Sequence, residues 1–115
     1  MLKKNERKMN RFIGKWKITE MEQWDKEYID FIEPGYFRFD NSNQGKFVFG
    51  TVSGFMDCRY DKNKSPRNVE FSWEGASEYD SVSGRGWFEL TSENSISGML
   101  FIHNGDQSWV KAMRE

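Results

Sequence analysis

The stretch NVEFSWE, residues 68–74, alternates between polar and apolar side chains without a break. In an extended chain its apolar side chains, Val69, Phe71 and Trp73, all point to one face. The polar side chains between them point to the other face. A period of two is typical of a strand with one buried and one exposed face, so this stretch predicts a β-strand.

Shorter patterns of the same kind recur on both sides, separated by residues that favour turns. We expect strands over residues 12–24, 36–40, 46–52, 55–60, 68–74, 84–91, 96–103 and 106–113. Ser53-Gly54 favours a two-residue reversal or a bulge, and residues 75–83 favour a long loop. Asn104-Gly105 favours a type I′ hairpin turn, whose two central residues both need positive φ. Residues 25–33, which end at Pro34-Gly35, favour a helical turn or a lid-like loop.

The composition supports an all-β fold. The chain has 115 residues, enough for one domain, with 19 Phe, Trp and Tyr residues against 5 Ala and Leu residues. Aromatic residues favour strands, whereas Ala and Leu are strong helix formers. A meander of about eight strands loses both exposed edges when it closes, so we predict a single antiparallel up-and-down barrel. A β-sandwich is the alternative.

The charge pattern divides the chain into an N-terminal arm, residues 1–11, and a barrel domain, residues 12–115. The basic residues of the arm are Lys3, Lys4, Arg7, Lys8 and Arg11. The net charge of −1 shows no general basic excess, which disfavours nucleic acid as a partner. No run approaches the ~18 apolar residues that span a bilayer, so we expect no membrane partner.

Cysteine usage and the start of the chain indicate the compartment. Cys58 is the single cysteine, which excludes an intrachain disulfide. No signal-peptide core follows the basic start, because residues 1–11 are too polar. Together these features predict a cytoplasmic protein.

The run Phe12-Ile13-Gly14-Lys15-Trp16 resembles the Gly-x-Trp opening of the calycin group, which includes the lipocalins and the fatty-acid-binding proteins. The resemblance implies that the first strand enters a barrel at Gly14 and that Trp16 plugs its closed end. It also implies that a basic residue near the end of the last strand packs across Trp16, and Arg114 occupies the matching position. A guanidinium stacks well on an indole face.

A closer resemblance covers nearly the whole chain, from Gly14 to Arg114. It is carried by residues 14–16, 20–22, 24–25, 57–60, 71–75 and 83–87. These segments are similar to those of a widespread family of small bacterial proteins without an established activity. The resemblance implies the domain boundaries and an intracellular setting, and it assigns no catalytic residue.

Charged and aromatic residues share strand faces in several places, as Arg85 does with Trp87. If these faces look inward, the lumen has aromatic walls with a few paired charges, which is the usual make-up of a small-molecule pocket. The function favoured on this basis is the binding of a small, partly polar or aromatic ligand inside the barrel. The predicted ligand-binding residues are Glu20, Glu22, Trp24, Asp57, Arg59, Trp73, Arg85 and Trp87.

Ordinary amphipathic strands are the alternative to a charged lumen. The charges would then face water, and the interior would be filled by Phe47, Phe49, Val69, Phe71, Trp73, Phe88 and Leu90. A filled barrel fits an interaction or scaffold protein without a small ligand. Such a protein would expose an apolar patch built from Tyr28, Ile29, Phe31 and Ile32, and a homodimer is one assembly that it could form.

An enzyme on the same barrel also stays open. Glu20 or Glu22 would act as the acid–base group and Arg59 or Arg85 as the electrostatic stabiliser. We expect neither a metal nor another cofactor. The only histidine, His103, falls beside a turn, and the acidic residues between Glu74 and Asp80 lack the spacing of a calcium loop.

Overall fold

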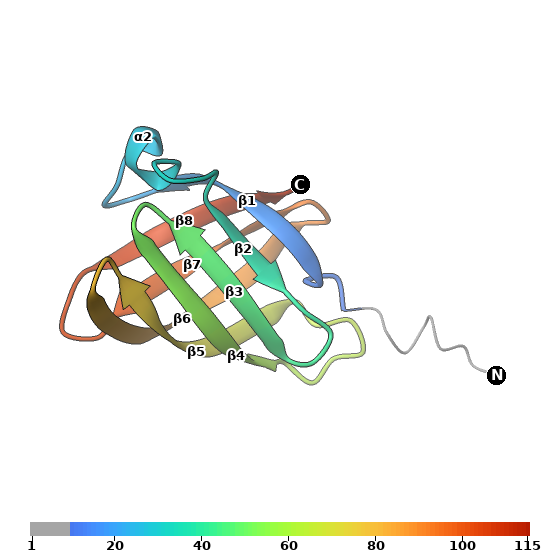
Figure 1. Ribbon diagram of the computed structural model, residues 1–115. Coiled ribbons are helices and arrows are strands. Elements are labelled where there is room, and N and C mark those ends of the chain that lie inside the picture. The colour runs from blue at the N-terminus through green and yellow to red at the C-terminus, as the bar shows by residue number, and fades with distance from the viewer. Residues whose placement is uncertain (1–9) are drawn as a thin grey trace.

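Eight strands follow one another around a barrel in the computed structural model, which describes residues 10–115 (Figure 1). Each strand pairs antiparallel with the next one along the chain, and the last strand closes the sheet against the first. The strands are β1 (Gly14–Met21), β2 (Tyr36–Phe39), β3 (Gln44–Phe49), β4 (Val52–Tyr60), β5 (Asn68–Ser77), β6 (Asp80–Ser92), β7 (Ser95–Ile102) and β8 (Gln107–Arg114). The expected up-and-down barrel is thereby confirmed. The short helix α2 (Lys26–Ile29) lies between β1 and β2, within the segment expected to form a helical turn.

Two of the expected connections lie elsewhere. The reversal between β3 and β4 falls at Gly50-Thr51 rather than at Ser53-Gly54, because Gly50 takes a φ of +56° that suits glycine. The long loop expected over residues 75–83 is wrong. Strands β5 and β6 continue through it and meet at a turn of two residues, in which Glu78 has a φ of +58°.

The hairpin between β7 and β8 lies where Asn104-Gly105 predicts it, but the turn type differs. Asn104 has a φ of +61°, whereas Gly105 is not in the positive-φ region, so the turn is not type I′. The N–H of Ile102 donates to the carbonyl of Asp106 at 2.9 Å and closes the hairpin.

The interior of the barrel is filled by side chains. The core residues expose between 0% and 7% of their surface. The ring of Phe37 lies 4.9 Å from that of Phe47 and 4.8 Å from that of Phe88, measured between centroids. Walls around a ligand-sized lumen would carry accessible surface, and these walls have almost none.

Inward-facing glycines make room for the large rings. A Cβ atom on Gly54 would lie 2.6 Å from the ring of Phe47, and one on Gly86 would lie 2.5 Å from the ring of Phe71. These glycines therefore accommodate rings rather than line an empty space.

The expected basic arm lies largely outside the described residues, which begin at Asn10. Its last cation, Arg11, is described and donates from Nε to Oγ of Ser65 at 3.2 Å. Within residues 10–115, the one helix is too short to cross a bilayer.

Candidate functional site

The charged candidates lie on the outside of the barrel, and the expectation that they line the lumen is wrong. The side chains that face solvent are those of Glu20, Glu22, Asp57, Arg59, Arg85 and Trp87. This outcome matches the alternative of amphipathic strands whose apolar faces fill the interior.

A bulge in β1 explains the outward position of Glu20. Trp16 and Ile18 face inward at a period of two, which by itself would place Glu20 inside as well. The register with β8 shifts between Ile18 and Glu20, so Met21 takes the next inward position instead. Glu22 follows the end of the strand, and its Oε1 accepts from the N–H of Trp109 at 3.3 Å.

Outward-facing aromatic residues explain the positions of the other charges. Phe55 in β4 is 64% exposed and Trp87 in β6 is 37% exposed. Asp57 and Arg59 share the face of Phe55, and Arg85 shares the face of Trp87. An aromatic residue in a strand pattern therefore marked the outer face in these two strands.

The two remaining tryptophan candidates lie where apolar side chains pack. Trp73 is 3% exposed and forms part of the filled interior, with its ring centroid 5.0 Å from that of Phe47. Trp24 is half-buried between β1 and α2, and its ring centroid lies 4.9 Å from that of Phe49. Neither ring borders an open lumen.

The residues of the expected plug lie in contact with one another. The guanidinium of Arg114 lies 4.2 Å from the centroid of the Trp16 ring, and its Nη1 donates to the carbonyl of Ile13 at 3.1 Å. The indole Nε1 of Trp16 donates to the carbonyl of Phe12 at 2.8 Å. Gly14 has a φ of +124°, and a Cβ there would lie 3.1 Å from Nη1 of Arg114. These contacts close the barrel end at which β1 begins.

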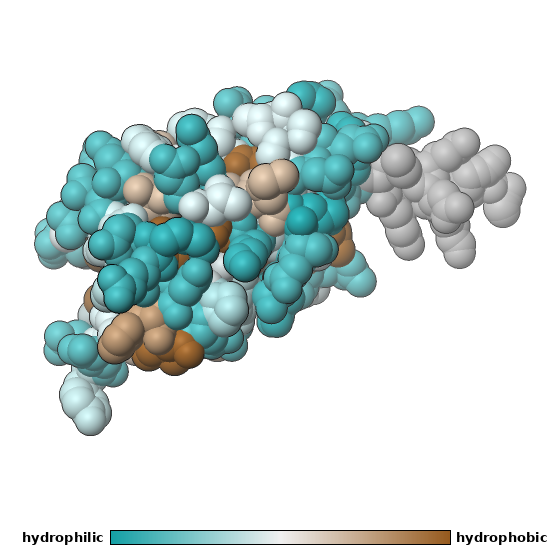
Figure 2. Space-filling view, turned by 90° about the horizontal axis from the view of Figure 1, so that it is seen from above, coloured by the Kyte–Doolittle hydropathy of each residue, from teal (hydrophilic) through white to brown (hydrophobic). Residues whose placement is uncertain are grey.

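The rim segment, residues 22–35, joins β1 to β2 at the opposite end and carries α2 (Figure 1). Of the apolar patch expected here, Ile29 is buried and Tyr28 is half-buried. Phe31 and Ile32 are 68% and 64% exposed. Figure 2 views the molecule from the α2 side, where hydrophilic residues predominate and hydrophobic residues form small separate patches.

Hydrogen bonds hold the rim segment in place. Asp25 caps α2 by accepting from the N–H of Tyr28 at 2.9 Å. The carboxylate of Asp30 accepts from Nζ of Lys26 at 2.6 Å and from the N–H of Gly35 at 2.8 Å. Partial burial acts to raise the pKa of Asp30, but the bonds from Lys26 and Gly35 together with the charge of Lys26 outweigh it, so the pKa is lowered. The exposed side chains of Phe31 and Ile32 therefore project from an anchored loop.

Four predicted residues do come together, in a hollow on the outer face of β4, β5 and β6. This Trp87 hollow has a volume of about 400 Å³ and is lined by Asp57, Arg59, Glu70, Phe71, Ser72, Arg85, Gly86 and Trp87. Arg59 donates to Asp57 at 2.7 Å, so that pair is internally neutralised.

A second hollow lies on the other side of Arg85. This Arg85 hollow has a volume of about 500 Å³ and is lined by Ser72, Ser83, Gly84, Arg85, Phe101 and His103. Sequence reasoning did not group these residues. They come from three strands and a turn, and only the strand register brings them together.

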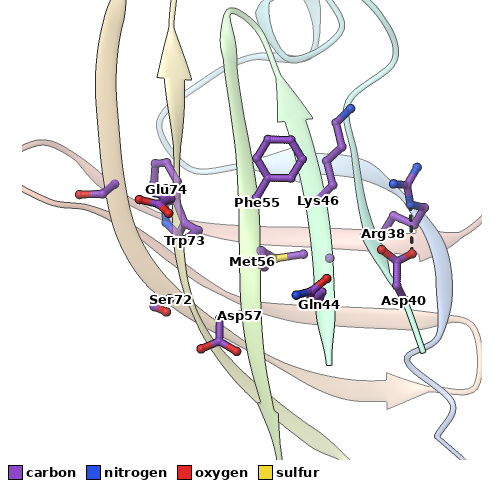
Figure 3. A pocket seen from close by; sticks show the side chains of 12 residues that line it. Arg38, Asp40, Gln44, Lys46, Phe55, Met56, Asp57, Ser72, Trp73 and Glu74 are labelled. Carbon is purple, nitrogen blue, oxygen red and sulfur yellow. Dashed lines mark ion pairs between the residues drawn. The ribbon is translucent and has the colours of Figure 1, made fainter. Parts of the chain in front are cut away.

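A larger groove of about 720 Å³ crosses the outer face from β2 to β6 (Figure 3). Its charges are mixed. Arg38 pairs with Asp40 at 3.3 Å, Lys46 lies 5.9 Å from the centroid of the Phe55 ring, and Glu74 lines the same groove. The groove therefore offers no concentrated charge of one sign.

The buried thiol of Cys58 is unsuited to nucleophilic chemistry. Burial raises its pKa to about 12, and the nearby negative charge of Asp57 acts in the same direction. Across the described part of the chain, no group of three or more His, Cys, Asp or Glu side chains is placed to hold a metal ion.

Comparison of the chain with protein-family models, with curated proteins and with solved structures finds no match.

Proposed function

We propose that this chain is an interaction module, in which a filled barrel presents its rim segment to a basic, amphipathic segment of a partner protein. The observation that carries the proposal is the exposure of Phe31 and Ile32, at 68% and 64%. Adjacent large apolar side chains on an anchored loop are typical of residues that contribute most to binding at an interface.

The anchoring favours binding energetically. The caps at Asp25 and Asp30 hold the loop from within, and the N–H of Gly50 donates to the carbonyl of Ile29 at 3.0 Å. Because the loop is already ordered, association costs less conformational entropy than the ordering of a free loop would.

The charge of the segment selects the partner. Between residues 20 and 33 the chain has six carboxylates and a single cation, Lys26. The carboxylates are Glu20, Glu22, Asp25, Glu27, Asp30 and Glu33. Lys26 is paired with Asp30, so the segment that carries the apolar pair has a net negative charge. A partner helix with an apolar stripe flanked by Lys or Arg complements both features.

Two other functions have less support. A ligand inside the barrel would need space that the core side chains occupy. Acid–base catalysis by Glu20 or Glu22 would need a carboxylate in an enclosed site, and both are exposed. The contact of Arg114 with Trp16 supports the resemblance to calycins, and kinship with that group is part of the proposal.

A designed peptide tests the proposal directly. The probe is a fluorescent helical peptide of Leu and Lys with one apolar stripe, titrated with the protein while its anisotropy is recorded. We expect saturable binding that weakens at least about tenfold in the double variant Phe31→Ser/Ile32→Ser. The matched control is Phe55→Ser, which removes a similarly exposed aromatic ring from another face.

The contrary results are equally definite. Equal binding by the double variant and by Phe55→Ser would overturn the proposed surface, as would equal binding of a peptide with Glu in place of Lys. Concentration-dependent self-association that the double variant abolishes, without peptide binding, would assign the surface to a second copy of the chain instead.

A further inference from the structure

Arg85 is held on the outer face with its hydrogen-bond donors available. Strand register places Phe101 of β7 directly beside it, and the guanidinium lies 4.1 Å from the centroid of the Phe101 ring. Stacking of this kind orients the plane of the guanidinium while leaving the N–H groups at its edge.

No carboxylate neutralises Arg85 within the described residues. The cations in ion pairs across residues 10–115 are Lys15, Lys26, Arg38 and Arg59. Arg59, two strands away, shows the contrast, because it donates to Asp57 at 2.7 Å. Within residues 10–115 Arg85 thus forms no ion pair, and the donors of its fork are available.

The Arg85 hollow is lined by groups that can donate. Its polar side chains are the hydroxyls of Ser72 and Ser83, the guanidinium of Arg85 and the imidazole of His103. None of its lining residues is acidic. Glu74, the register partner of Ser83, lines the neighbouring grooves instead.

These donors come from several directions. Ser72 lies beside Arg85 on β5, and the N–H of His103 donates to the carbonyl of Ser83 at 2.7 Å, which places His103 next to that serine. A planar carboxylate is satisfied by the two parallel bonds of one guanidinium. Donors spread around a hollow suit the tetrahedral oxygens of a phosphate group better.

An aromatic surface adjoins the hollow. Trp87 follows Arg85 by two positions on the same face of β6, about 6–7 Å along the strand. It is 37% exposed and lines the Trp87 hollow, which shares Arg85 and Ser72 with the Arg85 hollow. A ligand whose phosphate contacts Arg85 can extend past the guanidinium toward this indole, into a hollow that Asp57 and Glu70 also line.

We propose that the Arg85 hollow binds the phosphate of a phosphate monoester, and that Trp87 stacks against a planar ring attached to that phosphate. The guanidinium supplies charge-assisted bonds to two phosphate oxygens, and the hydroxyls of Ser72 and Ser83 donate to the remaining oxygens. This site is separate from the rim segment, so it stands or falls independently of the proposed interaction surface.

NMR titration of the full chain labelled with ¹⁵N tests the site. The probes are phenyl phosphate, inorganic phosphate and benzoate. Each is added until the chemical shifts of the protein no longer change. We expect phenyl phosphate to bind most tightly, with shift changes at the amides of Ser83, Gly84 and Arg85 and at the indole N–H of Trp87. Arg85→Gln should weaken phenyl phosphate at least about tenfold.

Two further variants make the result specific. Arg38→Gln is the matched control, because it removes an arginine that is already paired with Asp40 elsewhere on the outer face, and it should bind as the wild type does. Arg85→Lys keeps the charge but loses the stacked fork, and should bind more weakly than the wild type.

Several results would refute the site. Unchanged binding in Arg85→Gln, or an equal loss in Arg38→Gln, would show that the anion is held elsewhere or by general charge. If benzoate binds as tightly as phenyl phosphate, the hollow does not prefer phosphate over a carboxylate, and the proposed ligand class is wrong. Inorganic phosphate that binds as tightly as phenyl phosphate would remove the role of Trp87.

Discussion

Arg114 and Trp16 show how one residue pair links the last strand to the start of the first. The guanidinium covers the indole face and its two terminal nitrogens donate to the carbonyls of Ile13 and Arg11. The last strand is thereby joined to the chain that precedes the first. Gly14 leaves room for this arrangement. Its φ is positive, which disfavours any residue with a side chain, and a Cβ atom there would lie close to the guanidinium.

Cys58 should be inert until the barrel unfolds. Burial raises its pKa from 9.0 to about 12, so the reactive thiolate is absent near neutral pH. We expect Ellman's reagent to modify the thiol only at the rate of unfolding, and to modify it at once in denaturant. Rapid labelling of the native protein would contradict the burial.

The same shift has a consequence for stability at high pH. A folded pKa above the unfolded one adds stability that is present below pH 9.0 and is lost as the pH rises toward about 12. Urea unfolding between about pH 8 and about pH 10 should therefore show a steeper loss for the wild type than for Cys58→Ala.

The rim segment is an element whose order depends on two aspartates. Asp25 caps the start of α2, and Asp30 ties its end to Lys26 and to the backbone at Gly35. A helix of four residues is too short to be stable alone, so these side-chain bonds and the burial of Ile29 keep it in place.

Asp30→Asn should loosen the rim segment without unfolding the barrel. The variant loses the ion pair with Lys26 and weakens the bond from Gly35, at a cost below about 1 kcal/mol because the pair is partly exposed. Hydrogen exchange of the Gly35 amide should accelerate about threefold to tenfold. Glu33→Gln is the control, since Glu33 forms no ion pair within the described residues. If exchange of the Gly35 amide accelerates equally in this control, Asp30 does not hold the rim segment.

Acid should produce the same change in the wild type. The pKa of Asp30 is lowered in the folded protein. Its contribution to the stability of the rim segment is therefore present above the ordinary pKa of 3.8 and is lost as the pH falls through the lower pKa of the folded state.

At the scale of the whole molecule, the filled interior makes the barrel a rigid scaffold. Rings from β2, β3, β5 and β6 meet at its centre around Phe37, which is fully buried. Close-packed cores of this kind resist deformation, which suits a protein that presents fixed surfaces.

Phe37→Ala should open a cavity where the wild type has none. We expect a loss of about 3–5 kcal/mol in the free energy of unfolding, measured in urea, and new binding of benzene detected by NMR. Phe37→Leu keeps most of the volume and should lose less stability and bind no benzene. Benzene binding by the wild type would contradict a filled interior.

The amino-acid sequence by itself determined the fold class. Strict alternation in residues 68–74, aromatic residues in place of helix formers, and turn residues at short intervals specify antiparallel strands, whose edges disappear only on closure. The contact between Arg114 and Trp16 was expected from the resemblance to calycins, and it is physically favourable because a guanidinium stacks well on an indole face.

Only the tertiary structure decided which face of each strand is inside. Alternation defines two faces but does not choose between them when both carry large apolar groups, as Trp87 and Phe88 do on opposite faces of β6. The choice depends on volume: glycines at 54 and 86 turn inward because the rings of Phe47 and Phe71 need their space. The bulge after Ile18 places Glu20 on the outer face. The strand register brings Arg85, Phe101 and Ser83 into one hollow. Both depend on how strands pair in the closed sheet, which the local pattern of a single strand does not specify.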